Sequence, residues 1–341
     1  MVYLEILIPT YNRPLEITKC LDSIFESLSF VPKKSRSKIG ISIRNNSTKD
    51  LHKYKEIVKK YSKKFKKLNL AYFKYSITGR NIGGTKNIWS SFKKLNSKYV
   101  WILPDDDLAR FDSLDLIIGI LRKLKPVLIC GGCIKKSYIK DYNSNKILND
   151  DNQTNKILDT TYNRSKITKF LLSGNTVQLQ EYVYKTEFVQ TFIKLYKNSS
   201  LMHDMSPGVI AIHSLQEKNK PLVRLKKSIG IFRQGNNQVS DWRHLWWKFA
   251  LIDWPILSEK MYEKKWLNRK EFELSKKVYK HILKNLSWRL DILLGLNFKS
   301  QVDPRLLYKY YGYIYILTVL KSPLAFLNEI PKRIFTFLKI S

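Results

Sequence analysis

Residues Tyr99–Leu108 read YVWILPDDDL, an apolar run that stops at three consecutive carboxylates. The five residues before Pro104 are too few for a useful helix and predict a buried strand. Pro104 ends that strand because proline has no N–H to give to a neighbouring strand. The three acids therefore follow the carboxyl end of a strand, which is the edge where open α/β sheets collect ligands.

Asp105, Asp106 and Asp107 repel one another unless a cation or a set of hydrogen-bond donors holds them. Carboxylate oxygens suit Mg²⁺ or Mn²⁺, and Mg²⁺ is commonly held by one or two carboxylates together with substrate phosphates. The first hypothesis is therefore a site for a divalent cation and a diphosphate. The alternative is a solvated acidic turn ahead of a helix that starts near Asp112-Ser113.

Strand and helix patterns alternate on both sides of this stretch. Apolar residues predict strands at 4–8, 39–43 and 70–75, besides the strand at 99–103. Helical spacing follows at 17–28, 51–68, 88–95 and 114–124, and Asn12 is expected to cap the first helix, with Pro14 in its first turn. This alternation predicts an α/β fold with a mostly parallel, doubly wound sheet flanked by helices.

The later chain is less regular. A strand is expected at 126–130 and a helix after Lys185, and the segment 135–166 is long and polar. From about Asp241 the composition becomes aromatic and basic, and helical periodicity dominates. We therefore expect an α/β domain at residues 1–240 and a helical C-terminal appendage at residues 241–341.

The formal net charge of +34 implies an anionic partner or surface: nucleic acid, lipid or a phosphorylated substrate. Cys20, Cys130 and Cys133 are interpreted as reduced packing residues, which favours the cytoplasm. The first residues enter a strand directly, so no signal peptide is expected. No window approaches the roughly 20 apolar residues that span a bilayer.

The sequences ILIPTYNR at Ile6–Arg13, NIGG at Asn81–Gly84 and WILPDDD at Trp101–Asp107, taken together, resemble family 2 glycosyltransferases of the GT-A fold. The resemblance is close over about the first 130 residues and extends less closely to about residue 245. Each motif is weak alone, and the glycine pair by itself predicts an ordinary loop between a strand and a helix.

The resemblance implies a nucleotide-sugar donor, a divalent cation and inversion at the anomeric carbon. Asp105 and Asp107 match the family's Asp-x-Asp, which reaches the ribose and the metal-bound diphosphate. Asp107 is the first choice for the metal ligand, followed by Asp105. A cation there would stabilise the charge that develops on the leaving diphosphate. The expected donor-binding residues are Pro9, Thr10, Tyr11, Arg13, Asn45, Asn81, Gly83, Lys86, Asp105 and Asp106.

Two positions depart from the family pattern. Asn45 follows the second predicted strand where members commonly place an aspartate, and it could still hydrogen-bond a uracil edge. The acidic pair that supplies the catalytic base corresponds to His203-Asp204, so Asp204 is the expected base. The alternative for Asp204 is a helix cap. Arg233, Arg243 and His244 are expected donor ligands, or else part of a basic connector.

The C-terminal region combines apolar and basic residues. Residues 310–320 are apolar and rich in tyrosine, and they lie between Lys309 and Lys321. This pattern is typical of a helix at an anionic membrane surface. The alternative is a helical appendage that packs on the catalytic domain or forms a homo-oligomer.

These features predict a metal-dependent, inverting glycosyltransferase that extends a surface glycan such as lipooligosaccharide or capsule. The donor is expected to be a UDP-sugar and the acceptor a glycan or a lipid-linked glycan. The enzyme would work in the cytoplasm, at the inner face of the membrane. One rival is a basic nucleic-acid-binding protein, although no nucleic-acid motif is present and no nucleic-acid partner is expected. A second rival is a catalytically inactive GT-A-like membrane scaffold.

Overall fold

The computed structural model describes residues 2–137, 163, 166–168, 171, 179–196, 214–217, 219–234, 251–252, 254–285, 304–321 and 323. The chain divides into two compact units. The first comprises Met1–Ile167 and Thr176–Asn236, and the second comprises Thr168–Asn175 and Asn237–Ser341.

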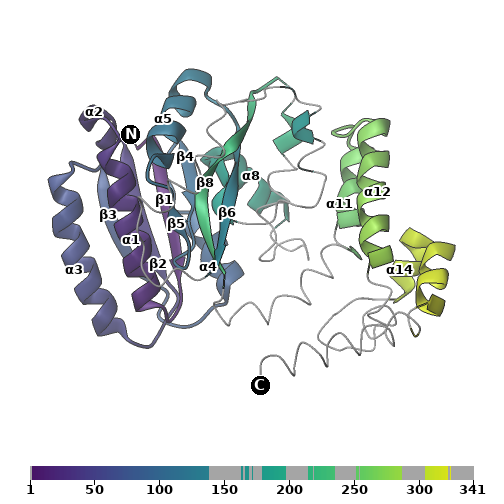
Figure 1. The fold of residues 1–341 in the computed structure, drawn as a ribbon, viewed down its shortest axis with the longest axis horizontal. Helices are drawn as coiled ribbons and strands as arrows, with labels where there is room; N and C mark the ends of the chain where they lie inside the picture. The colour runs from purple at the N-terminus through teal and green to yellow at the C-terminus, as the bar shows by residue number, and fades with distance from the viewer. Residues whose placement is uncertain are drawn as a thin grey trace. The chain divides into compact units, whose positions relative to one another are not determined.

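The described residues of the first unit form a single sheet in the order β3-β2-β1-β4-β7-β6-β8-β5 (Figure 1). Parallel pairing joins β1 to β2 and β4, β2 to β3, and β6 to β8, while β7 and β5 run antiparallel to their neighbours. The predicted mostly parallel α/β sheet is confirmed. The strands are β1 (Leu4–Thr10), β2 (Ile39–Asn45), β3 (Tyr72–Ile77), β4 (Tyr99–Ile102), β5 (Leu108–Ala109), β6 (Leu128–Ser137), β7 (Tyr182–Lys185) and β8 (Leu222–Gln234).

Helices cover both faces of this sheet (Figure 1). On one face, α1 (Pro14–Ser29), α3 (Leu51–Lys67) and α5 (Ser113–Leu124) share a core with Leu4 and Ile6 of β1. Because side chains alternate along a strand, Glu5 and Leu7 face the opposite side. There α4 (Gly84–Phe92) meets α8 (Thr186–Tyr196), whose Gln190 donates to the carbonyl of Phe92 at 2.9 Å. The shorter helices are α2 (Lys33–Arg36), η2 (Leu179–Glu181) and η3 (Ser214–Gln216).

Two expectations needed correction. Asn12 does not cap α1: its φ is +53°, and its side chain accepts a hydrogen bond from Ser47, while Arg13 occupies the N-cap position. Pro14 does lie in the first turn of α1, as predicted. The long strand β8 was not anticipated, and β6 continues to Ser137, into the segment expected to be a polar loop.

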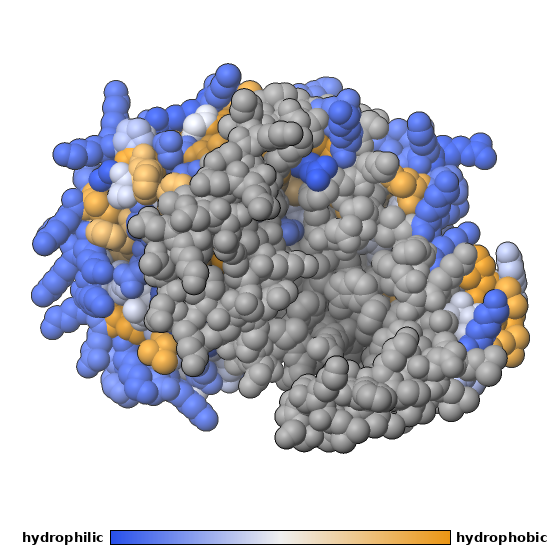
Figure 2. Space-filling model, in the orientation of Figure 1, coloured by the Kyte–Doolittle hydropathy of each residue, from blue (hydrophilic) through white to orange (hydrophobic). Residues whose placement is uncertain are grey.

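The helix α3 carries a dense run of lysines. This helix buries Tyr54, Tyr61 and Phe65 and turns an almost entirely basic face outward. Hydrophilic side chains cover this side of the molecule in Figure 2. The exposed lysines of α3 are Lys53, Lys55, Lys59, Lys60, Lys63, Lys66 and Lys67.

The described part of the second unit is helical, with α11 (Trp254–Glu263), α12 (Arg269–Asn285) and α14 (Pro304–Tyr311). α11 and α12 pack through the Trp254 indole, which donates to Ser275 at 3.0 Å, and through stacked Tyr262 and Phe272 rings 4.4 Å apart. Within the described residues, none of the helices combines the length and the apolar character that crossing a bilayer requires.

Candidate active site

A cluster of polar side chains lies where β1 and β4 end. Thr10 is the last residue of β1, and its hydroxyl donates to Asp105 Oδ2 at 2.6 Å. The Arg13 guanidinium donates to Asp105 Oδ1 at 3.1 Å and forms an ion pair with Asp106. Because β1 and β4 are parallel neighbours, their carboxyl ends bring these residues together despite more than ninety intervening positions.

The hydroxyl of Tyr54 on α3 holds the loop that carries Arg13. It accepts the backbone N–H of Arg13 at 2.8 Å and lies 3.0 Å from Thr10 Oγ1. Since the Thr10 proton is donated to Asp105, the Tyr54 hydroxyl donates to Thr10. Burial raises the pKa of Tyr54 to about 12, so the hydroxyl keeps its proton.

Asp105 is 3% exposed, and its burial, together with the charge of Asp106, raises its pKa to about 7. Arg13 and Thr10 oppose this rise because both donate hydrogen bonds to the carboxylate. Asp105 and Asp106 therefore share the Arg13 guanidinium.

Asp107 is 2% exposed, and its backbone N–H donates to the carbonyl of Pro104 at 3.0 Å, which closes a tight turn before β5. Among the residues described, no group of three or more histidine, cysteine or acidic side chains is arranged to hold a metal ion. Carboxylate oxygens of this kind suit a hard cation that arrives with phosphate oxygens.

The loop after β2 is tied to the loop after β3. Asn46 is buried, and its amide donates to Asn81 Oδ1 at 2.7 Å and accepts the backbone N–H of Ile82 at 3.0 Å. Asn81 Oδ1 also accepts the N–H of Gly83 at 2.9 Å. Gly83 has φ of +82° and ψ of 153°, a conformation that other residues adopt at a cost, so glycine starts α4 here.

Asn45 is fully buried and engaged within the protein. Its amide nitrogen donates to the Tyr75 hydroxyl at 2.9 Å, and its oxygen accepts the N–H of Ser47 at 2.8 Å. These bonds use one of its two amide hydrogens and one of the two lone pairs on its oxygen. Tyr11, in contrast, is 38% exposed next to this loop, and Lys86 is exposed on the first turn of α4.

Comparisons with known proteins identify the family of this chain. Residues 5–188 match the family described as Glycosyl transferase family 2. The chain belongs to this family. It is a glycosyltransferase with a GT-A fold, as the sequence motifs predicted. A comparison with curated proteins found no match.

Solved structures of the S. aureus protein TarS have a similar fold. TarS 1–349 aligns with a TM-score of 0.58 and 15% identity, covering 95% of this chain and 83% of that one. The complex of TarS 1–349 with UDP-GlcNAc gives a TM-score of 0.56 and 16% identity, covering 93% and 82%. Its complex with UDP gives 0.53 and 15%, covering 95% and 92%.

The structure brings together some of the predicted site residues of this family 2 chain. Thr10, Arg13, Asp105 and Asp106 are in direct contact, and Asn81 and Gly83 form one turn. Pro9 precedes this cluster within β1. Asp204, Arg243 and His244 lie outside the described residues, as does the side chain of Arg233, whose backbone ends β8 near Gln234.

Sequence reasoning missed Tyr54 and Asn46. Tyr54 falls at an apolar position of a helical pattern, where it predicts a core residue, and nothing local shows that its hydroxyl reaches Thr10. Asn46 follows Asn45 directly and differs from it in reaching the next loop. The sequence offered one signal, for Asn46: it follows a parallel strand directly, and the carboxyl ends of parallel strands lie at the same edge of the sheet.

Proposed function

We propose that this glycosyltransferase takes a nucleotide-sugar donor, with a UDP-sugar as the first candidate, and transfers the sugar with inversion to a surface glycan such as lipooligosaccharide or capsule. The observation that carries the proposal is the contact of Thr10, Arg13 and Asp105 at the joined ends of β1 and β4. TarS, which shares the fold, has been crystallised with UDP and UDP-GlcNAc.

We further propose that donor binding needs Mn²⁺ or Mg²⁺, held by Asp107 with support from Asp105. The run of buried and half-buried carboxylates supports this, because Mg²⁺ and Mn²⁺ are commonly held by one or two carboxylates together with substrate phosphates. The bound cation would offset the charge that grows on the leaving diphosphate. Arg13 would hold the neighbouring carboxylates in place, and Tyr54 would hold the backbone of Arg13.

A thermal-shift titration with UDP, with and without Mn²⁺, tests both proposals, because a bound ligand stabilises the native state. We expect UDP to raise the melting temperature only when Mn²⁺ is present. Asp107→Ala should remove this shift, whereas Asp115→Ala, which changes an exposed acid on α5, should keep it. A UDP shift that is independent of Mn²⁺ would reject the metal proposal. If no nucleoside diphosphate shifts the melting temperature, the proposal of a nucleotide-sugar donor is rejected.

Asp204 remains the proposed catalytic base. Removing the base leaves the donor site intact, so Asp204→Asn should keep the UDP shift and lose transfer to an acceptor. Normal transfer by this variant would show that another residue acts as the catalytic base.

We also propose that the C-terminal unit docks on an anionic membrane surface. After the turn at Gly312, the helical residues 313–321 turn Tyr315 and Thr318 inward and leave large apolar side chains exposed. A basic residue, Lys321, follows them, which suits anionic lipid. A homo-oligomer formed through the same face is the outcome that would replace this proposal. The exposed side chains are Tyr313, Ile316, Leu317 and Leu320.

A further inference from the structure

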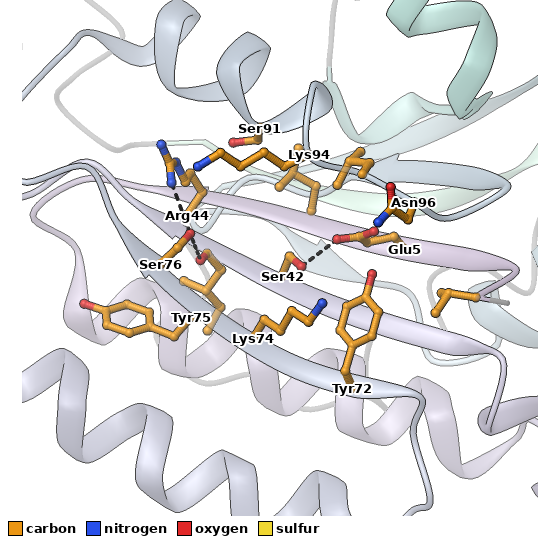
Figure 3. Close-up of a pocket in the computed structure, with 14 residues that line it drawn as sticks. Glu5, Ser42, Arg44, Tyr72, Lys74, Tyr75, Ser76, Ser91, Lys94 and Asn96 are labelled. Carbon is orange, nitrogen blue, oxygen red and sulfur yellow. Dashed lines mark hydrogen bonds between the residues drawn. The ribbon is translucent and has the colours of Figure 1, made fainter.

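A pocket of about 400 Å³ lies on the sheet face that α4 covers (Figure 3), and the residues of the Asp105 cluster are not among those that line it. Alternate residues of β1, β2 and β3 form its floor, and the C-terminal end of α4 with the residues that follow forms its roof. This volume falls within the range of small-molecule sites. Its polar lining includes Glu5, Ser42, Arg44, Tyr72, Ser76 and Lys94.

One end of the pocket is cationic. Arg44 donates to Ser76 at 3.4 Å, and its Nε is buried without a hydrogen-bond partner in the described part of the chain. Lys94 extends from the end of α4 toward Arg44 (Figure 3). Asn87 holds α4 against the backbone of Arg44, because its side-chain amide donates to the carbonyl of Arg44 at 3.1 Å. A guanidinium and an ammonium that converge in this way suit a phosphate.

The other end of the pocket holds a buried carboxylate. Glu5 is 3% exposed; its Oε1 accepts from Ser42 at 2.5 Å, the Tyr72 hydroxyl points toward the carboxylate (Figure 3), and Oε2 is buried with no hydrogen-bond partner among the described residues. The ring of Tyr72 lies against Gly40, where a Cβ would meet it at 2.4 Å, so glycine makes room for this wall. An unpartnered buried acceptor is costly, and a hydroxyl group of a ligand would satisfy it.

We propose that this pocket binds a phosphorylated sugar or polyol, with the phosphate at Arg44 and Lys94 and a hydroxyl donating to Glu5. The two ends carry opposite unmet needs: Arg44 Nε lacks an acceptor and Glu5 Oε2 lacks a donor. A phosphate ester supplies acceptor oxygens and negative charge, and its polyol part supplies donors. The proposal does not rest on the donor site, because no pocket residue belongs to the Asp105 cluster.

Isothermal titration of the full chain with glucose 6-phosphate tests the proposal, and excess UDP is added to occupy the donor site. We expect binding to persist with UDP and to weaken about tenfold or more in Lys94→Ala, because that variant loses a charged contact. Lys93→Ala is the matched control, since Lys93 is an exposed neighbour that does not line the pocket. Equal loss in both variants, or displacement by UDP, would overturn the proposal.

Glu5→Gln tests the other end of the pocket with two probes. We expect this variant to lose affinity for glucose 6-phosphate and to keep or gain affinity for inorganic phosphate, because phosphate alone makes no hydroxyl contact and avoids a nearby carboxylate. An unchanged ratio of the two affinities would refute the role of Glu5. The affinity for a glycerol phosphodiester, compared with that for glucose 6-phosphate, shows whether the pocket prefers a terminal phosphate monoester or a phosphate that links two groups within a glycan chain.

Discussion

Asp105 should make the stability of the ligand-free protein fall as the pH rises. Its pKa is raised from 3.8 to about 7 by burial and by Asp106. Between these values the native state keeps a proton that the unfolded chain has released, so unfolding becomes easier with increasing pH. About 3 pKa units at 1.36 kcal/mol each correspond to a loss on the order of 4 kcal/mol between pH 4 and pH 7.

Asp105→Asn isolates this contribution because the amide carries no charge at any of these pH values. We expect the difference in unfolding free energy between wild type and variant to shift in favour of the variant by several kcal/mol from pH 4 to pH 7. Urea unfolding followed by far-UV circular dichroism at half-unit pH steps measures it. The other titrating groups contribute to both proteins and largely cancel.

A second variant sharpens the test. Thr10 donates to the Asp105 carboxylate and thereby favours its ionised form. Thr10→Val removes that hydrogen bond, so the pH range over which stability is lost should extend to higher pH. Parallel pH curves for wild type and Asp105→Asn would refute the reasoning, because they would mean that Asp105 titrates alike in the native and unfolded states.

Three further predictions concern the supports of the site and the C-terminal face. Tyr54→Phe leaves the Arg13 N–H without its acceptor and should cost about 1–3 kcal/mol and weaken UDP binding, whereas Tyr61→Phe on the same helix should leave UDP binding unchanged. Gly83→Ala should cost about 1–3 kcal/mol in urea unfolding because of its positive φ, while Gly119→Ala within α5 should be stabilising. Leu320→Glu should reduce co-sedimentation with anionic vesicles, and an equal reduction by Leu15→Glu, at an exposed leucine of α1, would argue against a specific face.

The first half of the sheet could be predicted because each of its strands is a short apolar run followed by a helical pattern. β8 could not. Its alternation is interrupted at Lys226 and Lys227, and its pairing with β6 shifts register around Gly132. Such an irregularity breaks the period of two that identifies a strand in sequence. The strand order was likewise out of reach, since β7 inserts between β4 and β6 from a distant part of the chain.

The acidic run located the site but did not define its contacts. Local sequence assigned Asn12 to a helix cap, because asparagine is common there, yet its left-handed backbone turns the side chain toward Ser47 of the next loop. Asn45, which could hydrogen-bond a uracil edge, also hydrogen-bonds Tyr75 and Ser47, and the sequence did not indicate the contact with Tyr75. The Asn45–Tyr75 and Asn12–Ser47 pairs join positions 30 and 35 residues apart, and single-sequence patterns carry no information on such pairs.

The loops after β1, β2 and β3 hold one another, and this links the acids to the glycine turn. The Asn46 N–H donates to the Thr10 carbonyl at 2.9 Å, and the Asn46 amide donates to Asn81. Thr10 in turn donates to Asp105, so a continuous set of contacts runs from the start of α4 to the buried carboxylate. A ligand that orders any one of these loops therefore constrains the others. Asn46, which no motif singled out, therefore connects the end of β1 at Thr10 to the turn at Asn81.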